Sequence, residues 1–117
     1  MHFSSRHGRL RLQLRLLRQG RDWLALFSGG AAHLGAVALA APGTGGEARL
    51  LALPGHREDA LVLEAARRLS DALQCAVCVG AGIHYDAITP EELLQVEIMV
   101  RDLTERCLAS LTEETSC

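Results

Sequence analysis

The alternation of charged and apolar side chains over residues 9–18 constrains the fold more than any other feature of this sequence. Leucine occupies positions 10, 12, 14 and 16, and arginine or glutamine occupies positions 9, 11, 13 and 15. Side chains of a strand point alternately to its two faces, so this period of two predicts a strand with one apolar face and one polar face. The polar row with Arg9, Arg11 and Arg15 is typical of the solvated side of an edge strand, whose charges resist aggregation.

Four more strands and two helices are predicted further along the chain. The strand patterns cover residues 23–28, 34–41, 47–53 and 75–81. Apolar residues at helical spacing predict an amphipathic helix over residues 58–74. A second helix is predicted from Thr89 to about residue 112, because Thr89 and Glu92 form a capping box around Pro90.

The order of these elements predicts an α+β fold in one domain. We expect a five-stranded, mostly antiparallel sheet with both helices packed on one face. The chain has 117 residues, the usual size of a single domain, and its apolar content of 49% suffices for a core. Residues 1–8 are expected to be a flexible N-terminus and residues 9–117 to form the domain.

One face of this sheet is expected to lie bare, because two helices can cover only the other. Several of the predicted strands are apolar or small on both sides, and an uncovered apolar face usually marks an interface. We therefore expect a homodimer. The contact is either the bare sheet face or the second helix, where Leu94, Ile98 and Met99 widen the apolar stripe beyond what one packing surface needs.

Composition argues against nucleic acids and membranes as partners. The net charge is −2 and only 3% of residues are aromatic, whereas proteins that bind single strands combine basic grooves with aromatic platforms. The longest apolar run, residues 34–41, contains a glycine and is too short to span a bilayer. The N-terminal region has no apolar signal core, so we expect a cytoplasmic protein.

Three loops contain most of the unusual residues, and each carries a histidine near glycine. They cover residues 29–36, 55–59 and 80–86. Glycine lets a ligand approach the backbone closely, and histidine offers a hydrogen-bond donor and acceptor or a metal ligand. Loops that converge would form one binding site; the alternative is three ordinary turns with surface histidines. The candidate binding residues are Gly29, Gly30, His33, Gly35, His56, Arg57, Glu58, His84, Tyr85 and Asp86, and the candidate ligands of a divalent metal are His33, His56 and His84.

The chemistry of these residues leaves several roles open. Arg57 precedes a predicted helix whose N-terminal amides favour an anion, so it could clamp a phosphate; the alternative is that Glu58 or Asp59 caps that helix. Tyr85 could stack on a planar ring or fill the edge of the sheet, and Asp86 could organise a turn. No serine lies in a nucleophile elbow and no pair of carboxylates marks a cleft. The residues therefore favour a binding protein with no catalytic residues, while an enzymatic role stays open.

These loops and their neighbours together resemble the LpdD-like family of prenylated flavin chaperones. Three motifs carry the resemblance in this order along the chain: Asp22-Trp23 with GGxxHxGAVA over residues 29–38, GHRED over residues 55–59, and AGIHYDxITxEE over residues 81–92. The resemblance covers nearly the whole chain after residue 10. One departure is the pair Ala31-Ala32, where more polar residues are expected.

The resemblance implies a dimeric fold similar to that of proteasome-assembly chaperones, with reduced prenylated flavin mononucleotide (prenylated FMN) as the ligand. Members of the family accompany UbiD-type decarboxylases such as gallate decarboxylase, and a UbiX-type prenyltransferase makes the cofactor. The chain would then store, protect or deliver the cofactor to its decarboxylase. Two alternatives stay open: a maturation factor that promotes oxidation of the cofactor, and a structural subunit of the decarboxylase complex. The resemblance assigns no role to individual residues.

Overall fold

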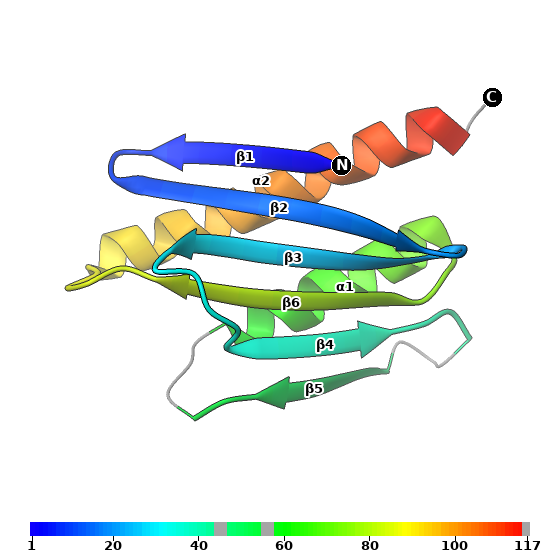
Figure 1. Cartoon of the computed structure of the whole chain (residues 1–117), viewed down its shortest axis with the longest axis horizontal. Helices are drawn as coiled ribbons and strands as arrows, with labels where there is room; N and C mark the ends of the chain where they lie inside the picture. The colour runs from blue at the N-terminus through cyan, green and yellow to red at the C-terminus, as the bar shows by residue number, and fades with distance from the viewer. Residues whose placement is uncertain (44–46, 55–57, 116–117) are drawn as a thin grey trace.

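A computed structural model describes residues 1–43, 47–54 and 58–115, the side chains of residues 113–115 excepted. Its elements follow in the order β1 (His2–His7), β2 (Leu10–Gln19), β3 (Asp22–Gly30), β4 (Ala36–Ala40), β5 (Ala48–Ala52), α1 (Asp59–Leu73), β6 (Val77–His84) and α2 (Pro90–Thr115). The strands form one sheet with the helices on one side of it (Figure 1). The α+β class and the position of both helices are therefore as predicted.

The sheet has six strands and is mixed, which corrects the prediction of five mostly antiparallel strands. The strand order is β1-β2-β3-β6-β4-β5. β3 pairs with β6 in parallel, and the other neighbours pair antiparallel. β5 and β6 flank β4 and run in the same direction, so their connection must cross over the sheet, and α1 supplies that crossover. The parallel pairing of β3 with β6 joins segments far apart in the sequence, so the residue pattern of a single strand cannot predict it.

The additional strand is β1, in the segment expected to be a flexible N-terminus. His2–His7 pairs antiparallel with β2, and a turn with Gly8 at a φ of +59° joins the two strands. Phe3 packs against the core, and Nη1 of Arg106 in α2 donates to the carbonyl oxygen of Ser4 at 2.7 Å. The remaining side chains of β1 are polar, so no alternation of apolar residues could reveal the strand. β2 is consequently an internal strand, although its arginine row does face solvent as predicted.

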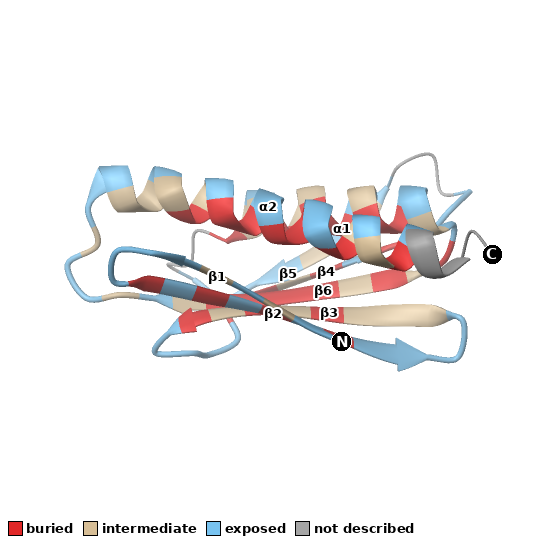
Figure 2. Cartoon of the chain, turned by 90° about the horizontal axis from the view of Figure 1, so that it is seen from above, coloured by how far each residue is buried: buried red, intermediate tan, exposed pale blue. Residues whose placement is uncertain are grey.

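The core lies between the sheet and the helices. α1 packs on β4, β5 and β6, and α2 packs on β1, β2 and α1 (Figure 2). The leucine row of β2 and the valines of β6 are buried there, and the side chain of Met99 joins them with 2% exposure. Met99 therefore cannot belong to a dimer contact on the outside of α2, unlike Leu94 and Ile98, which are exposed. Neither described helix combines the length and the apolar character that a membrane span requires.

The connection from β3 to β4 crosses β6, because β6 lies between those two strands. Residues 31–35 pass over the end of β6 on the face that carries no helix (Figure 1). A Cβ atom on Gly82 would collide with the carbonyl carbon and oxygen of His33, and one on Gly30, which has a φ of +65°, would collide with the carbonyl oxygen of His84. These two glycines therefore allow backbone to approach backbone, which is a structural use of residues that the sequence suggested as openings for a ligand.

We predict that Gly82→Ala destabilises the fold more than Gly20→Ala. The new methyl group at residue 82 must displace the main chain of the crossing connection, so we expect a loss of about 3 kcal/mol in the free energy of unfolding. Gly20 has a φ of +60°, and no atom lies within 4 Å of the position that a Cβ atom would take there. Its alanine variant should therefore lose only roughly 1–2 kcal/mol through backbone strain. Urea unfolding measures both variants, and equal losses would contradict the proposed role of Gly82.

Candidate functional site

A cavity of about 470 Å³ opens where the C-terminal end of β6 meets the first turns of α1 and α2. We call it the histidine cavity. Its volume lies in the range of small-molecule sites, about 300–1,000 Å³. Apolar side chains form much of its wall, and a few polar groups face it, as is usual for ligand pockets. The lining residues are His33, Glu58, Leu61, Ile83, His84, Tyr85, Ile88, Leu93, Val96 and Glu97.

The structure brings His33 and His84 together in this cavity. Their ring centroids are 6.4 Å apart and the rings are inclined by 79°. Nδ1 of His33 donates to the carbonyl oxygen of Ala31 at 3.2 Å, and Nε2 of His84 lies 3.1 Å from a carboxylate oxygen of Asp86. The crossing of β6 by residues 31–35 is what places His33 beside the strand end that carries His84. The third predicted histidine, His56, and its neighbour Arg57 lie outside the described residues.

Glu58 joins the start of α1 to the end of β6. It is the N-cap residue of α1, but its side chain makes no capping hydrogen bond. Instead, its Oε1 accepts a hydrogen bond from the backbone N–H of Ile83 at 3.1 Å, and the residue is only 7% exposed. Glu58 therefore holds the N-cap position, one of the two that the capping alternative named, but its carboxylate contributes to the wall of the histidine cavity instead of capping the helix.

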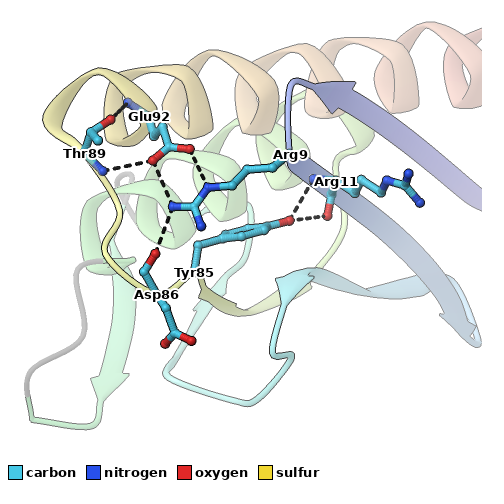
Figure 3. Close-up of polar contacts among 6 residues, drawn as sticks. All are labelled: Arg9, Arg11, Tyr85, Asp86, Thr89 and Glu92. Atoms are coloured by element: carbon cyan, nitrogen blue, oxygen red, sulfur yellow. Dashed lines mark hydrogen bonds and ion pairs between the residues drawn. The ribbon is translucent and has the colours of Figure 1, made fainter.

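Tyr85 anchors the end of β6 to β2. Its hydroxyl accepts from the backbone N–H of Arg11 at 2.7 Å and donates to the carbonyl oxygen of the same residue at 3.0 Å (Figure 3). The guanidinium carbon of Arg9 lies 5.6 Å from the centre of the tyrosine ring, a distance at which a cation is attracted to the ring face. These are the contacts of a residue that fills the edge of the sheet, which is one of its two expected roles.

Arg9 is held by a bidentate ion pair with Glu92 at the start of α2. Its Nε and Nη2 donate to the two carboxylate oxygens of Glu92 at 2.8 and 3.0 Å, and Nη2 also donates to the carbonyl oxygen of Asp86 at 2.9 Å (Figure 3). Glu92 caps the helix as predicted, because Thr89 N–H donates to its Oε1 at 3.0 Å and Thr89 Oγ1 accepts from the Glu92 N–H at 3.1 Å. Hydrogen bonds from Arg9 and Thr89 lower the pKa of Glu92 from 4.5 to about 2.

A second cavity, of about 410 Å³, lies on the other side of Tyr85. We call it the arginine hollow. It contains two of the predicted glycines, and Tyr85 is the residue that it shares with the histidine cavity. The lining residues are Arg9, Arg11, Gln13, Ser28, Gly29, Gly30, Ala32 and Tyr85.

The remaining predicted residues lie elsewhere. Gly35 lines neither of these cavities and belongs to an apolar groove with Leu34, Leu51 and Leu53. The side chain of Asp86 is 98% exposed and contacts the site only through His84. Among the described residues, no group of three or more histidine, cysteine, aspartate or glutamate side chains is arranged to hold a metal ion.

The ion pair of Arg9 with Glu92 and most of the apolar wall leave no signal in the sequence. The sequence places Arg9 in a solvated row, and no local pattern links it to a residue so far along the chain. Leu93 and Val96 are recognisable as part of the apolar stripe of the second helix.

The mixed six-stranded sheet with two helices on one face defines a small α+β protein whose fold recurs in a known structure. A solved yeast structure, described as a novel chaperone complex for 20S proteasome assembly, matches with a TM-score of 0.56 and 13% sequence identity, and the match covers 97% of this chain and 96% of that chain. Residues 6–112 match the family model described as the prenylated flavin chaperone LpdD-like domain. The chain therefore belongs to this family, as the resemblance of its loops indicated. No curated protein matches the sequence.

We predict that the ion pair of Glu92 makes stability depend on pH between about 4.5 and 2. The folded state lowers the pKa of this carboxylate, so its stabilising contribution is present above the unfolded pKa and is lost as the pH falls through the folded one. The stability difference between wild type and Glu92→Gln should therefore narrow over this window in urea unfolding at a series of pH values. Glu91→Gln, which removes the same charge from the same helical turn, is the control. A difference that stays constant down to pH 2 would contradict the assignment.

Proposed function

We propose that this prenylated flavin chaperone is a cytoplasmic carrier that binds reduced prenylated FMN with its ring system in the histidine cavity. The observation that carries the proposal is the pairing of His33 and His84, 6.4 Å apart, in a largely apolar cavity at the end of the sheet. Membership of the family supports a chaperone of prenylated flavin as the general role. We further propose that the chain stores or protects the cofactor and delivers it to a UbiD-type decarboxylase, after a UbiX-type prenyltransferase has made it.

The described lining suits the ring system of this cofactor. Leu61, Ile88 and Leu93 offer the apolar surface that a prenylated ring would bury. His33 and His84 offer hydrogen-bonding groups for the nitrogen and oxygen atoms at the polar edge of the flavin.

We also propose that the chain forms a homodimer. Two apolar surfaces are candidates for the contact. On the bare face of the sheet, the side chains of Leu39 and Leu51 are 53% and 76% exposed. On the outside of α2, Leu94 and Ile98 are 61% and 57% exposed. Exposed leucines that cluster on one surface are typical of protein contacts.

The carrier proposal predicts that the protein retains prenylated FMN through His33 and His84. Protein co-expressed with a UbiX-type prenyltransferase and purified without oxygen should carry the cofactor, as detected by absorbance and mass spectrometry. His33→Ala and His84→Ala should each weaken binding by about twofold to tenfold, the effect of one neutral hydrogen bond. His2→Ala, in β1 outside the cavity, should bind like wild type. A colourless protein without ligand mass would contradict the proposal.

The same variants separate a carrier from a maturation factor. A carrier whose histidines are substituted loses affinity, whereas a catalyst of cofactor oxidation loses turnover and keeps its affinity. Anaerobic titration followed by controlled admission of oxygen measures both quantities on one sample. Stable, cofactor-independent co-elution with the decarboxylase in size-exclusion chromatography would instead identify a structural subunit.

Charge introduced at the correct apolar surface should convert the homodimer to a monomer. We expect this for either the double variant Leu39→Glu/Leu51→Glu on the sheet or Leu94→Glu/Ile98→Glu on α2, because a glutamate at an apolar contact must lose its hydration when the contact forms. Light scattering coupled to size-exclusion chromatography gives the mass at several concentrations. Each double variant is the control for the other, since both add the same charge at exposed positions. A monomeric wild type would contradict the proposed homodimer.

A further inference from the structure

The described lining of the histidine cavity is acidic. Its described lining carries the carboxylates Glu58 and Glu97 and no lysine or arginine. Like charges repel, and in a partly enclosed site this repulsion is screened less than in water. These carboxylates disfavour the anionic end of a ligand whose ring occupies this cavity. The arginine hollow adjoins the cavity through Tyr85, and consecutive residues, Ala32 and His33, line the two sites.

Arg11 is the available cation of the arginine hollow. Arg9 is already neutralised by Glu92. Arg11 uses its main chain to bind the Tyr85 hydroxyl, and its guanidinium makes no hydrogen bond or ion pair with a described residue. It lies directly opposite Arg6 in the β1–β2 ladder. Like charges in opposing ladder positions destabilise a sheet, and an anion bound to Arg11 would offset this repulsion.

Neutral donors accompany Arg11 on the same face of the sheet. Gln13 and Ser28 are partners in the β2–β3 ladder, so their side chains are neighbours, and both line the arginine hollow. Gly29 and Gly30 leave the adjoining wall free of side chains. A guanidinium beside amide and hydroxyl donors is a suitable set for a phosphate, which accepts charge-assisted hydrogen bonds through its oxygens.

We propose that the arginine hollow is a phosphomonoester site, in which Arg11, Gln13 and Ser28 bind the phosphate of the flavin whose ring occupies the histidine cavity. This inference rests on the proposed function for the identity of the ligand, but the phosphate chemistry of the hollow stands on its own contacts. Tyr85 is a positioning residue in this arrangement. Its hydroxyl holds the main chain of Arg11, and its side chain forms the wall that both sites share.

Inorganic phosphate tests the hollow without any flavin. Titration of ¹⁵N-labelled protein should shift the backbone amide signals of Gly29, Gly30 and Ala32 in a saturable manner. Arg11→Gln should weaken this binding roughly tenfold to a hundredfold, the effect of a charged hydrogen bond. Ser28→Ala should weaken it less. Arg15→Gln is the matched control, because Arg15 belongs to the same row of β2 but does not line the hollow, and it should bind phosphate like wild type.

Three results would overturn the proposal: no saturable shift at these amides, an equal loss in Arg15→Gln, or a loss in Arg57→Gln with none in Arg11→Gln. The amide spectrum of each variant shows whether it is folded. Anaerobic binding of reduced prenylated FMN and of its dephosphorylated form then tests the link to the flavin. Arg11→Gln should weaken binding of the phosphorylated form only. If wild type binds phosphate at the hollow but neither flavin, the proposed function fails while the phosphate site is retained.

Discussion

The passage of residues 31–35 over the end of β6 is the constraint on which the site depends. Because β6 lies between β3 and β4, the chain cannot connect those two strands without crossing it. The crossing is close enough that Gly30 and Gly82 admit no side chain. It also brings His33 to the strand end that carries His84, so a topological requirement of the sheet creates the histidine pair. A fold in which β6 lay at an edge of the sheet would separate these two residues.

A second set of contacts holds the end of the sheet to the start of α2. The carboxylate of Glu92 closes the capping box with Thr89 and binds Arg9 at the turn between β1 and β2, so one side chain joins the helix to the sheet. Arg9 in turn lies over the ring of Tyr85, whose hydroxyl is bound to Arg11. This chain of contacts lies at the surface, where each ion pair alone contributes little to stability. Its effect is to restrict where Tyr85 can lie, and Tyr85 separates the two cavities.

Local sequence patterns predict most of the strands and both helices. The order of the strands in the sheet depends on long-range pairing, which these patterns do not contain. The period of two in residues 9–18 and the capping box at Thr89 depend only on neighbouring residues, and both were confirmed. The insertion of β6 between β3 and β4 depends on partners far apart in sequence, so no segment could reveal it. β1 lacked the apolar alternation that makes a strand visible. The sequence marks the glycine-containing loops as unusual. In the structure, Gly30 and Gly82 are needed because the main chain of another segment lies too close to admit a side chain.

The bare face of the sheet is divided by charge, and this division limits how two copies could pair on it. The half formed by β1 and β2 carries Arg6, Arg11 and Arg15, whereas the half formed by β4 and β5 carries exposed leucines and a single arginine, Arg49, opposite Leu39. Two copies stacked over their whole faces would place arginines against arginines or against leucines, and both arrangements bury charge without a partner. Pairing over the leucine half alone reduces this cost to the single Arg49, whose long side chain can extend its charged end to the rim of the contact. It also leaves the arginine half, and with it the hollow beside Tyr85, open to a ligand in each copy.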